Sequence, residues 1–323
     1  MTTAFIFPGQ GSQSVGMGKA LFEDFATARA VFEETDAALS QKLSTLMFEG
    51  PEAELTLTAN AQPALMAVSV AAMRVLQSET GLDLERDARF VAGHSLGEYS
   101  ALCAAGAFSL ADAARLLRLR GEAMQKAVAP GEGAMAALLG LDAEAAAAAA
   151  AGAASDTGLV CQVANDNAPG QVVVSGAKAA VERAVAIARE KGARRAMLLP
   201  VSAPFHCALM QPAAEAMARA LAERPPGTPA VPLVANMEAK PITDPGSIRD
   251  SLVRQVTGTV RWRESVAYMA AQGVTRFVEV GAGKVLSGLV KRIAEGATIL
   301  SVGAPADIAA FLAAFPAGSP AKA

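Results

Sequence analysis

Apolar and polar positions divide the chain into short apolar runs and longer amphipathic stretches, which predicts strands separated by helices. The apolar runs predict strands at residues 4–7, 90–92, 231–235, 276–280 and 298–302. The amphipathic stretches predict helices at residues 22–39, 62–76, 96–105, 110–128, 211–223, 248–256 and 262–272. Strands that alternate with helices in this order predict an α/β domain built on a parallel sheet with both faces covered.

The pattern changes after Pro130. The following segment predicts, in order, strand, helix, strand, strand, helix and strand at residues 134–141, 143–154, 160–165, 171–175, 178–191 and 196–201. This β-α-β-β-α-β order is typical of a ferredoxin-like unit. We therefore predict a ferredoxin-like small subdomain at residues 129–201, inserted in a large domain formed by residues 1–128 and 202–323. The tail after Pro316 is expected to be frayed.

One motif joins a predicted strand to a predicted helix. Residues 93–97 read G-H-S-L-G, the G-x-S-x-G pattern of a nucleophile elbow. In such a turn Gly93 and Gly97 leave room where a Cβ would collide with the crowded backbone. Ser95 lies at the tip, at a helix N-terminus whose free N–H groups favour developing negative charge. With 28 glycines in the chain, the motif alone is a weak signal, and its strand–helix context is what favours a nucleophile.

A serine hydroxyl needs a neighbouring base to become nucleophilic, and the chain has two histidines. His94 directly precedes Ser95, so its side chain is expected to project away from the serine hydroxyl. His206 remains as the candidate base, in a loop that Pro200 and Pro204 make rigid. No acidic residue stands in an evident motif between Ser95 and His206. A backbone or amide oxygen is therefore a candidate to orient the imidazole.

The composition indicates a globular protein with a large core. Hydrophobic residues make up 52% and charged residues 18% of the 323 positions, and the net charge is −3, so no basic field favours nucleic acid. The three cysteines, Cys103, Cys161 and Cys207, have neither a disulfide framework nor a metal-ligand spacing. The N-terminal residues have no basic region before their apolar run, so a signal peptide is not expected, and no apolar run approaches the roughly 18 residues of a membrane span. We predict a soluble, cytoplasmic protein with no metal, nucleic-acid or membrane partner.

Five motifs occur in order along the chain: FPGQGSQ at residues 7–13, GHSLGEYSAL at 93–102, RLRGEAMQ at 118–125, PVSAPFHCALM at 200–210 and EVGAGKVLSGL at 279–289. Together they resemble the malonyl-CoA:acyl-carrier-protein transacylases of bacterial fatty acid synthesis. The resemblance runs from residue 4 to residue 302. It implies an α/β-hydrolase-like large domain that carries the ferredoxin-like small subdomain. Ala282 stands where many relatives have proline, which touches none of the expected chemistry.

The resemblance also implies a set of catalytic groups. Ser95 is the nucleophile that becomes malonylated, and His206 is its base. Gln255 matches the residue whose backbone carbonyl orients the imidazole, which accounts for the missing acid. The backbone N–H groups of Gln10 and Leu96 match the oxyanion hole of the family.

The helical period gives an independent argument about Arg120. At about 100° per residue, Arg120 falls at the edge of the apolar stripe of the helix predicted at residues 110–128, while the other cations of that helix lie well off it. A buried arginine needs an anionic partner, and an internal ion pair with a protein carboxylate is one alternative. The resemblance implies instead that Arg120 holds the free carboxylate of malonate. Phe205 resembles the malonyl-selecting position of related acyltransferases, where its bulk should crowd a 2-methyl branch.

The resemblance implies malonyl-CoA as a substrate, no cofactor, acyl carrier protein as the acceptor and a monomeric enzyme. Carrier proteins are acidic, so exposed cations are candidate docking charges, with ordinary solvated surface as the alternative reading. The candidates are Lys191, Arg194, Arg195, Lys284, Lys291 and Arg292.

Three other functions would share part of this pattern. A serine hydrolase, such as an esterase or a phospholipase, would share the elbow and the base but would not need Arg120 inside. A trans-acting polyketide acyltransferase would use the same residues as the transacylase. A nucleotide-binding site is disfavoured because Ser14 replaces the third glycine of G-x-G-x-x-G and no Ser or Thr follows Lys284.

Overall fold

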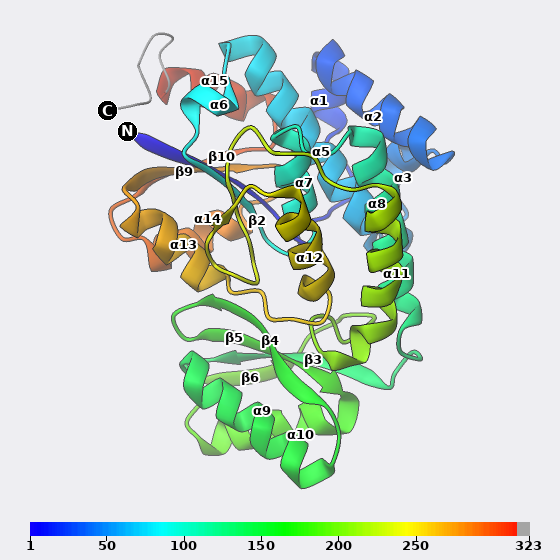
Figure 1. Cartoon of the computed structure of the whole chain (residues 1–323), viewed down its shortest axis with the longest axis vertical. Coiled ribbons are helices and arrows are strands. Elements are labelled where there is room, and N and C mark those ends of the chain that lie inside the picture. The colour runs from blue at the N-terminus through cyan, green and yellow to red at the C-terminus, as the bar shows by residue number, and fades with distance from the viewer. Residues whose placement is uncertain (315–323) are drawn as a thin grey trace.

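The computed structural model describes residues 1–314, which form two lobes built on separate sheets (Figure 1). The large lobe holds a six-stranded sheet in the order β10-β9-β1-β2-β7-β8. Its strands are β1 (Thr2–Phe7), β2 (Phe90–Gly93), β7 (Leu233–Val234), β8 (Pro241–Ile242), β9 (Val274–Val280) and β10 (Thr298–Val302). The tail after Pro316, for which fraying was predicted, lies outside the described residues.

The strand β1 lies at the centre of this sheet and pairs in parallel with β2 and β9. Because successive side chains of a strand point to opposite faces, Phe5 and Phe7 enter one core while Ala4 and Ile6 enter another. The predicted α/β class with a parallel sheet buried on both faces is confirmed. The edge strand β8 differs, because it runs antiparallel to β7.

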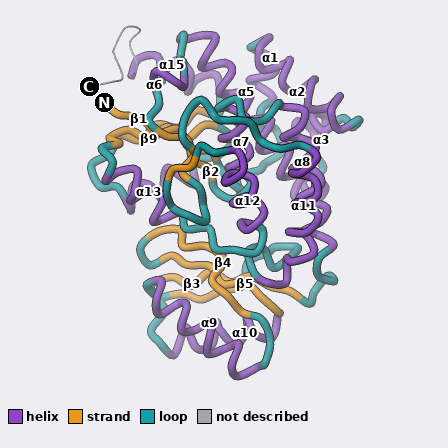
Figure 2. Tube along the Cα trace, in the orientation of Figure 1, coloured by secondary structure: helices purple, strands orange, loops and turns teal. Residues whose placement is uncertain are grey.

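Helices cover both faces of the large sheet (Figure 2). On one face the core includes side chains of α2, α5, α7, α8 and α11, and on the other those of α13 and α14. The helices of the large lobe are α1 (Lys19–Asp24), α2 (Ala26–Leu39), α3 (Leu43–Glu49), α4 (Glu52–Thr56), α5 (Thr58–Thr80), α6 (Leu84–Asp87), α7 (Gly97–Ala104), α8 (Leu110–Lys126), α11 (Gln211–Glu223), α12 (Pro245–Gln255), α13 (Trp262–Ala271), α14 (Val285–Ile293) and α15 (Pro305–Ala314), with a short 3-10 turn at Ala208–Met210.

The prediction of a single helix at residues 22–39 is wrong. The segment is divided between α1 and α2, because Phe25 takes an extended conformation with φ −126° and ψ 119°. Within the described residues, no helix has both the length and the apolar character needed to cross a membrane.

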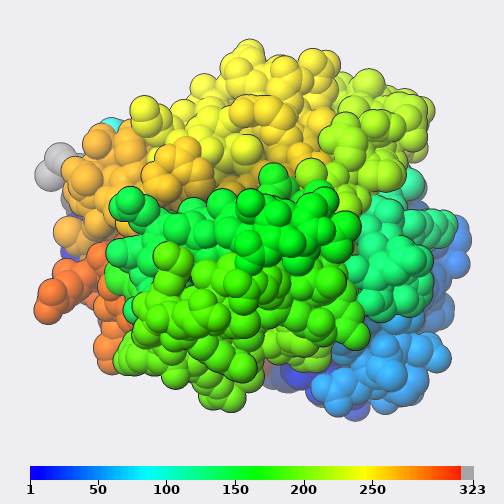
Figure 3. Space-filling view, turned by 90° about the horizontal axis from the view of Figure 1, so that it is seen from below, coloured from blue at the N-terminus to red at the C-terminus, as the bar shows by residue number. Residues whose placement is uncertain are grey.

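The small lobe follows the predicted β-α-β-β-α-β order. Its elements are β3 (Gly133–Leu139), α9 (Ala143–Thr157), β4 (Cys161–Ala168), β5 (Gln171–Ala177), α10 (Lys178–Glu190) and β6 (Arg195–Leu198). The strands pair antiparallel in the order β4-β5-β3-β6, and α9 and α10 pack on the sheet over a small, alanine-rich core. Figure 3 shows this segment, in green, as one contiguous block. The boundaries at residues 129 and 201 stay a prediction.

The segment that precedes α13 ties β4 to the large lobe. Asp166 N–H donates to the Val260 carbonyl at 3.0 Å, and Val260 N–H donates to the Ala164 carbonyl at 2.8 Å. Arg263 Nε lies 2.9 and 3.0 Å from the two carboxylate oxygens of Asp166. These contacts hold the C-terminal end of β4 beside the elbow of the large lobe.

Candidate active site

The turn between β2 and α7 places Ser95 at its tip. Ser95 has a left-handed backbone with φ 52°, as a sharp strand-to-helix turn requires. A Cβ on Gly93 would lie 1.9 Å from the carbonyl of Gly97, and one on Gly97 would lie 2.3 Å from the carbonyl oxygen of Phe7. The atoms that such a Cβ would meet belong to the backbone, so they cannot move aside as a flexible side chain could. Only glycine therefore fits at either position, as the sequence predicted.

His206 lies directly against the serine hydroxyl. Its Nε2 is 2.8 Å from Ser95 Oγ, and its Nδ1 is 2.9 Å from the backbone carbonyl oxygen of Gln255. A carbonyl oxygen only accepts, so Nδ1 carries the proton and Nε2 of the neutral ring is free to accept from the hydroxyl. The loop after β6 thus brings together the three residues that the sequence assigned to the nucleophile, its base and the orienting carbonyl.

The imidazole of His206 is held in its neutral form. Burial lowers the pKa of His206 to about 3, and the positive charge of Arg120 acts in the same direction. Only 4% of the residue is exposed. An imidazole that stays neutral near pH 7 can take a proton from the serine.

Arg120 reaches the same point from α8. Its Nη2 donates to Ser95 Oγ at 3.1 Å and to Gln255 Oε1 at 2.8 Å, and its Nη1 donates to Gln62 Oε1 at 2.8 Å. The side chain is buried, and burial lowers its pKa. Among the described residues no carboxylate forms an ion pair with Arg120, so the internal ion pair weighed from the sequence is not found.

His94 points elsewhere, as its position before Ser95 predicted. Its Nε2 lies 2.8 Å from Asn167 Oδ1, near the end of β4, and its ring lies 5.8 Å from that of Trp262. Burial lowers its pKa. His94 therefore links the elbow to the small lobe and leaves His206 alone at the hydroxyl.

Ser95 and His206 open into a pocket of about 580 Å³ between the two lobes. Gln10, Leu96, Arg120 and Phe205 also line it, so it gathers every other sequence-predicted site residue except Gln255. Gln255 lies behind the pocket wall and is fully buried. A larger cavity of about 870 Å³ lies beside α14, but neither Ser95 nor His206 lines it.

Sequence reasoning missed two residues that hold the elbow. Asn236 follows β7, accepts from Ser95 N–H at 2.8 Å through Oδ1 and donates from Nδ2 to the Gly93 carbonyl at 2.7 Å. Glu98, on α7, is fully buried and accepts from Asn236 N–H at 2.5 Å and from Gln255 Nε2. A carboxylate three residues after the serine, in an otherwise apolar helix, was the available signal for Glu98. Asn236 gave none, because it lies 141 residues from its partner Ser95.

A parallel α/β sheet with a serine on its strand–helix turn and an imidazole against the hydroxyl is the arrangement of enzymes that pass acyl groups through serine. The fold and the site therefore define a class of enzymes that form an acyl-serine intermediate, which includes acyltransferases and serine hydrolases.

Comparison with known proteins narrows this class. The acyl transferase domain family matches residues 4–313. The malonyl CoA-acyl carrier protein transacylase of Escherichia coli is 49% identical over 309 residues, which cover 96% of this chain and 98% of the relative. An acyl-carrier-protein-S-malonyltransferase structure from Bartonella henselae superposes with a TM-score of 0.94 at 58% identity, over 97% of this chain and 99% of that one. A malonyl-transacylase in complex with a type II PKS acyl-carrier protein superposes with a TM-score of 0.93 at 43% identity, over 97% of this chain and all of that one. The chain belongs to the malonyl CoA-acyl carrier protein transacylase family.

Proposed function

We propose that the protein transfers the malonyl group of malonyl-CoA to the phosphopantetheine thiol of acyl carrier protein, through a malonyl-serine intermediate. One observation carries the proposal: in the pocket, His206 Nε2 lies 2.8 Å and Arg120 Nη2 lies 3.1 Å from the hydroxyl oxygen of Ser95. We assign the reaction to fatty acid biosynthesis in the cytoplasm, carried out by a monomer without a cofactor, a membrane or nucleic acid.

In the first half-reaction His206 Nε2 takes the proton of Ser95, and Ser95 Oγ attacks the thioester carbonyl. The Gln255 carbonyl holds Nδ1–H and stabilises the imidazolium that forms. The C–S bond then breaks, CoA leaves as the thiol with the proton from Nε2, and the malonyl ester remains on Ser95. In the second half-reaction the carrier thiol gives its proton to His206 Nε2 and its sulfur attacks the ester carbonyl. The bond between the carbonyl carbon and Ser95 Oγ then breaks, and Oγ takes the proton from His206, which restores Ser95.

The negative charge on the tetrahedral intermediate is assigned to the backbone N–H groups of Gln10 and Leu96. Both residues line the pocket, and Leu96 directly precedes the first residue of α7. Within the described chain neither N–H has a backbone acceptor of its own. A donor of this kind is typically worth about 3 kcal/mol of activation free energy.

Arg120 is assigned to the free carboxylate of malonate, since a guanidinium binds a carboxylate through two parallel hydrogen bonds. Its partners in the structure, Gln62, Gln255 and Ser95, are all neutral, which leaves the positive charge for the substrate. Phe205, on the pocket wall, is assigned to the exclusion of a 2-methyl branch.

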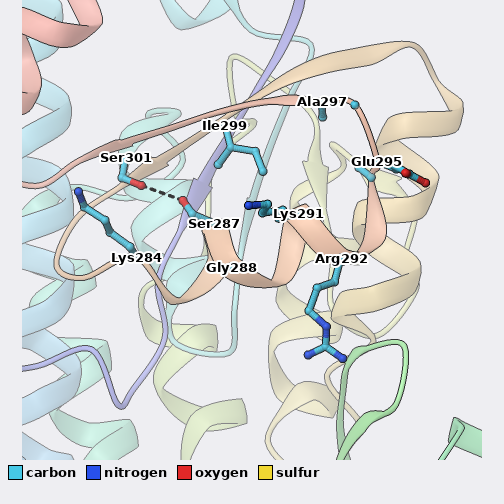
Figure 4. Close-up of a pocket in the computed structure, with 11 residues that line it drawn as sticks. Lys284, Ser287, Gly288, Lys291, Arg292, Glu295, Ala297, Ile299 and Ser301 are labelled. Carbon is cyan, nitrogen blue, oxygen red and sulfur yellow. Dashed lines mark hydrogen bonds between the residues drawn. The ribbon is translucent and has the colours of Figure 1, made fainter. Parts of the chain in front are cut away.

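The carrier protein is assigned to the face beside α14, where Lys284, Lys291 and Arg292 are exposed around the 870 Å³ cavity (Figure 4). The opposite side of the same helix lines the Ser95 pocket through Leu286 and Leu289. An acidic partner on this face would therefore deliver its thiol close to the pocket mouth. Lys191, Arg194 and Arg195 are also exposed and form a second candidate group.

Exposure to malonyl-CoA followed by mass spectrometry tests the proposal. We expect one malonyl group on Ser95, transfer of that group to added acyl carrier protein, and no adduct on Ser95→Ala. Steady release of free malonate without transfer would instead identify a serine hydrolase. The polyketide alternative, favoured by the relative in complex with a type II PKS carrier, predicts faster transfer to a polyketide carrier than to a fatty acid carrier.

A further inference from the structure

Glu98 is a buried carboxylate beside the site to which the reaction assigns no role. It lies on the first turn of α7, and its side chain is fully excluded from solvent. Its Oε1 accepts from Asn236 N–H at 2.5 Å, and its Oε2 accepts from Gln255 Nε2. Both oxygens therefore face N–H donors, an arrangement that suits an ionised carboxylate.

The side-chain amide of Gln255 lies between Glu98 and Arg120. Its Nε2 donates to Glu98 and to the Ser95 carbonyl, the latter at 3.0 Å, while its Oε1 accepts from Arg120 Nη2 at 2.8 Å. A carboxylate can only accept and a guanidinium can only donate. The amide consequently has one orientation that satisfies both neighbours, and Glu98 holds its Nε2 end while Arg120 holds its Oε1 end.

We propose that Glu98 is a positioning residue for Arg120, acting through the Gln255 amide, and that it sets the preference of the pocket for a substrate with a free carboxylate. The inference rests on the proposed malonyl transfer. Without Glu98 the amide can turn its Nε2 toward Arg120, which places a donor against a donor and displaces the guanidinium from its position beside Ser95. The Gln255 backbone carbonyl that holds His206 belongs to the end of α12 and does not depend on this choice.

The groups around the Glu98 carboxyl have opposing effects on its pKa. Burial raises the pKa of Glu98 to about 8, and the charge of Glu238 adds to this effect. The hydrogen bonds from Asn236 and Gln255, and the charge of Arg120, favour the ionised form. Because both carboxyl oxygens face N–H donors, these hydrogen bonds oppose the effect of burial and favour the ionised form.

Glu98→Gln tests the proposal because it keeps the size of the side chain and removes the charge. We expect the rate of Ser95 acylation by malonyl-CoA to fall by about 10- to 100-fold, as displaced catalytic groups typically cause. Acylation by acetyl-CoA, which does not use Arg120, should fall by much less. In an Arg120→Ala background the same substitution should leave the malonyl rate almost unchanged, because the group it positions is already gone.

Glu279→Gln is the matched control. Glu279 is also fully buried and also accepts two N–H groups, from Leu286 at 3.0 Å and Ser287 at 2.7 Å, but it does not contact Gln255 or Arg120. It should lower stability without changing the ratio of malonyl to acetyl rates. An unchanged ratio in Glu98→Gln, or losses that multiply with those of Arg120→Ala, would overturn the positioning role.

Two further measurements keep the test decisive. If Glu98→Gln does not fold, Gln255→Met removes the amide and keeps the backbone carbonyl, and it should also lower the malonyl rate selectively. Equal loss on both substrates in Gln255→Met would then reject the proposal. The wild-type protein is measured in parallel, because failure of its own malonylation would reject the proposed function and not the role of Glu98 alone.

Discussion

Ser95 and His206 both have left-handed backbones, with φ 52° and 59°, which residues other than glycine rarely adopt. Such conformations cost about 1–3 kcal/mol each and persist where the surroundings impose them. Ser95 is held by its N–H bond to Asn236, and His206 by its Nδ1–H bond to the Gln255 carbonyl. Ser40 and Ala239 are the other non-glycine residues of the described chain with positive φ, and Ser95 and His206 are the pair that meets at 2.8 Å, where the chemistry is proposed.

Arg120→Ala should impair acylation by malonyl-CoA about 30-fold or more, since loss of one partner of a buried charge pair costs 2 kcal/mol or more. Acylation by acetyl-CoA should change far less, because only malonate carries the second charge. Arg118→Ala is the control on the same helix, as Arg118 bonds Asn60 and Gln41 away from the pocket. Single-turnover rates on both substrates measure the effect. Equal losses on both would show that Arg120 is structural.

The acid limb of the pH–rate profile for acylation should lie well below the ordinary histidine pKa of about 6.5. Burial, and then the charge of Arg120, lower the pKa of His206 to about 3, so the base stays neutral across that range. In Arg120→Ala the limb should move to higher pH, because the second cause is removed. A limb at the ordinary histidine value in the wild type would contradict the neutral base.

The same shift affects stability. The folded pKa of His206 is below the unfolded one, so protonation favours the unfolded chain. Its contribution to the free energy of unfolding is complete above about pH 6.5 and is lost as the pH falls toward the folded value. Urea unfolding at a series of pH values should show this loss. A His206→Gln variant, which does not titrate there, should show less of it.

Functional residues could be predicted from the sequence where a local motif or a local periodic pattern indicates their role. Ser95 stands in a motif, and His206 was reached by elimination. Arg120 was found from its place on a helical stripe. Glu98 and Asn236 could not be assigned in the same way, because their roles depend on each other and on Gln255 across 138 and 157 positions of chain. Contacts formed only by tertiary packing leave little local signal.

At the scale of elements, the turn between β2 and α7 has no space for a side chain at Gly93. Gly93→Ala should lower the free energy of unfolding by about 3 kcal/mol or more, or prevent folding, because its Cβ would lie 1.9 Å from backbone atoms of Gly97. Gly288→Ala is the control, since a Cβ there has no atom within 4 Å and the residue lies in a helix. It should be neutral or stabilise by up to about 1 kcal/mol. Chemical unfolding measures both.

Most elements followed from periodicity, and the exceptions have physical reasons. The break at Phe25 inside a continuous amphipathic pattern shows packing that overrides local propensity. The helices α3, α4, α6, α14 and α15 were not predicted. In α14, Leu286, Leu289 and Val290 have helical spacing, but the helix is short and contains Gly288. The antiparallel strand β8 has two residues, too few for a recognisable pattern.

At the scale of the molecule, the site exists because two lobes meet over the elbow. Phe205 and His206 follow the last strand of the small lobe, and His94 bonds to Asn167 of that lobe. The order of elements predicted both lobes, but the sequence could not show how β4 attaches to the segment before α13. That attachment combines backbone bonds with the ion pair between Asp166 and Arg263.

Arg263→Ala should lower the free energy of unfolding by about 1–3 kcal/mol, because it leaves the Asp166 carboxylate, only 7% exposed, without its guanidinium. The value lies below that of a fully buried pair because 35% of the Arg263 side chain is exposed to solvent. Since Asn167 follows Asp166 and contacts His94 beside the serine, acylation by malonyl-CoA and acetyl-CoA should slow together. Arg183→Ala breaks an exposed pair with Asp156 inside the small lobe and should change neither the stability nor the rate appreciably. Equal effects of the two variants would mean that the attachment of the lobes does not support the site.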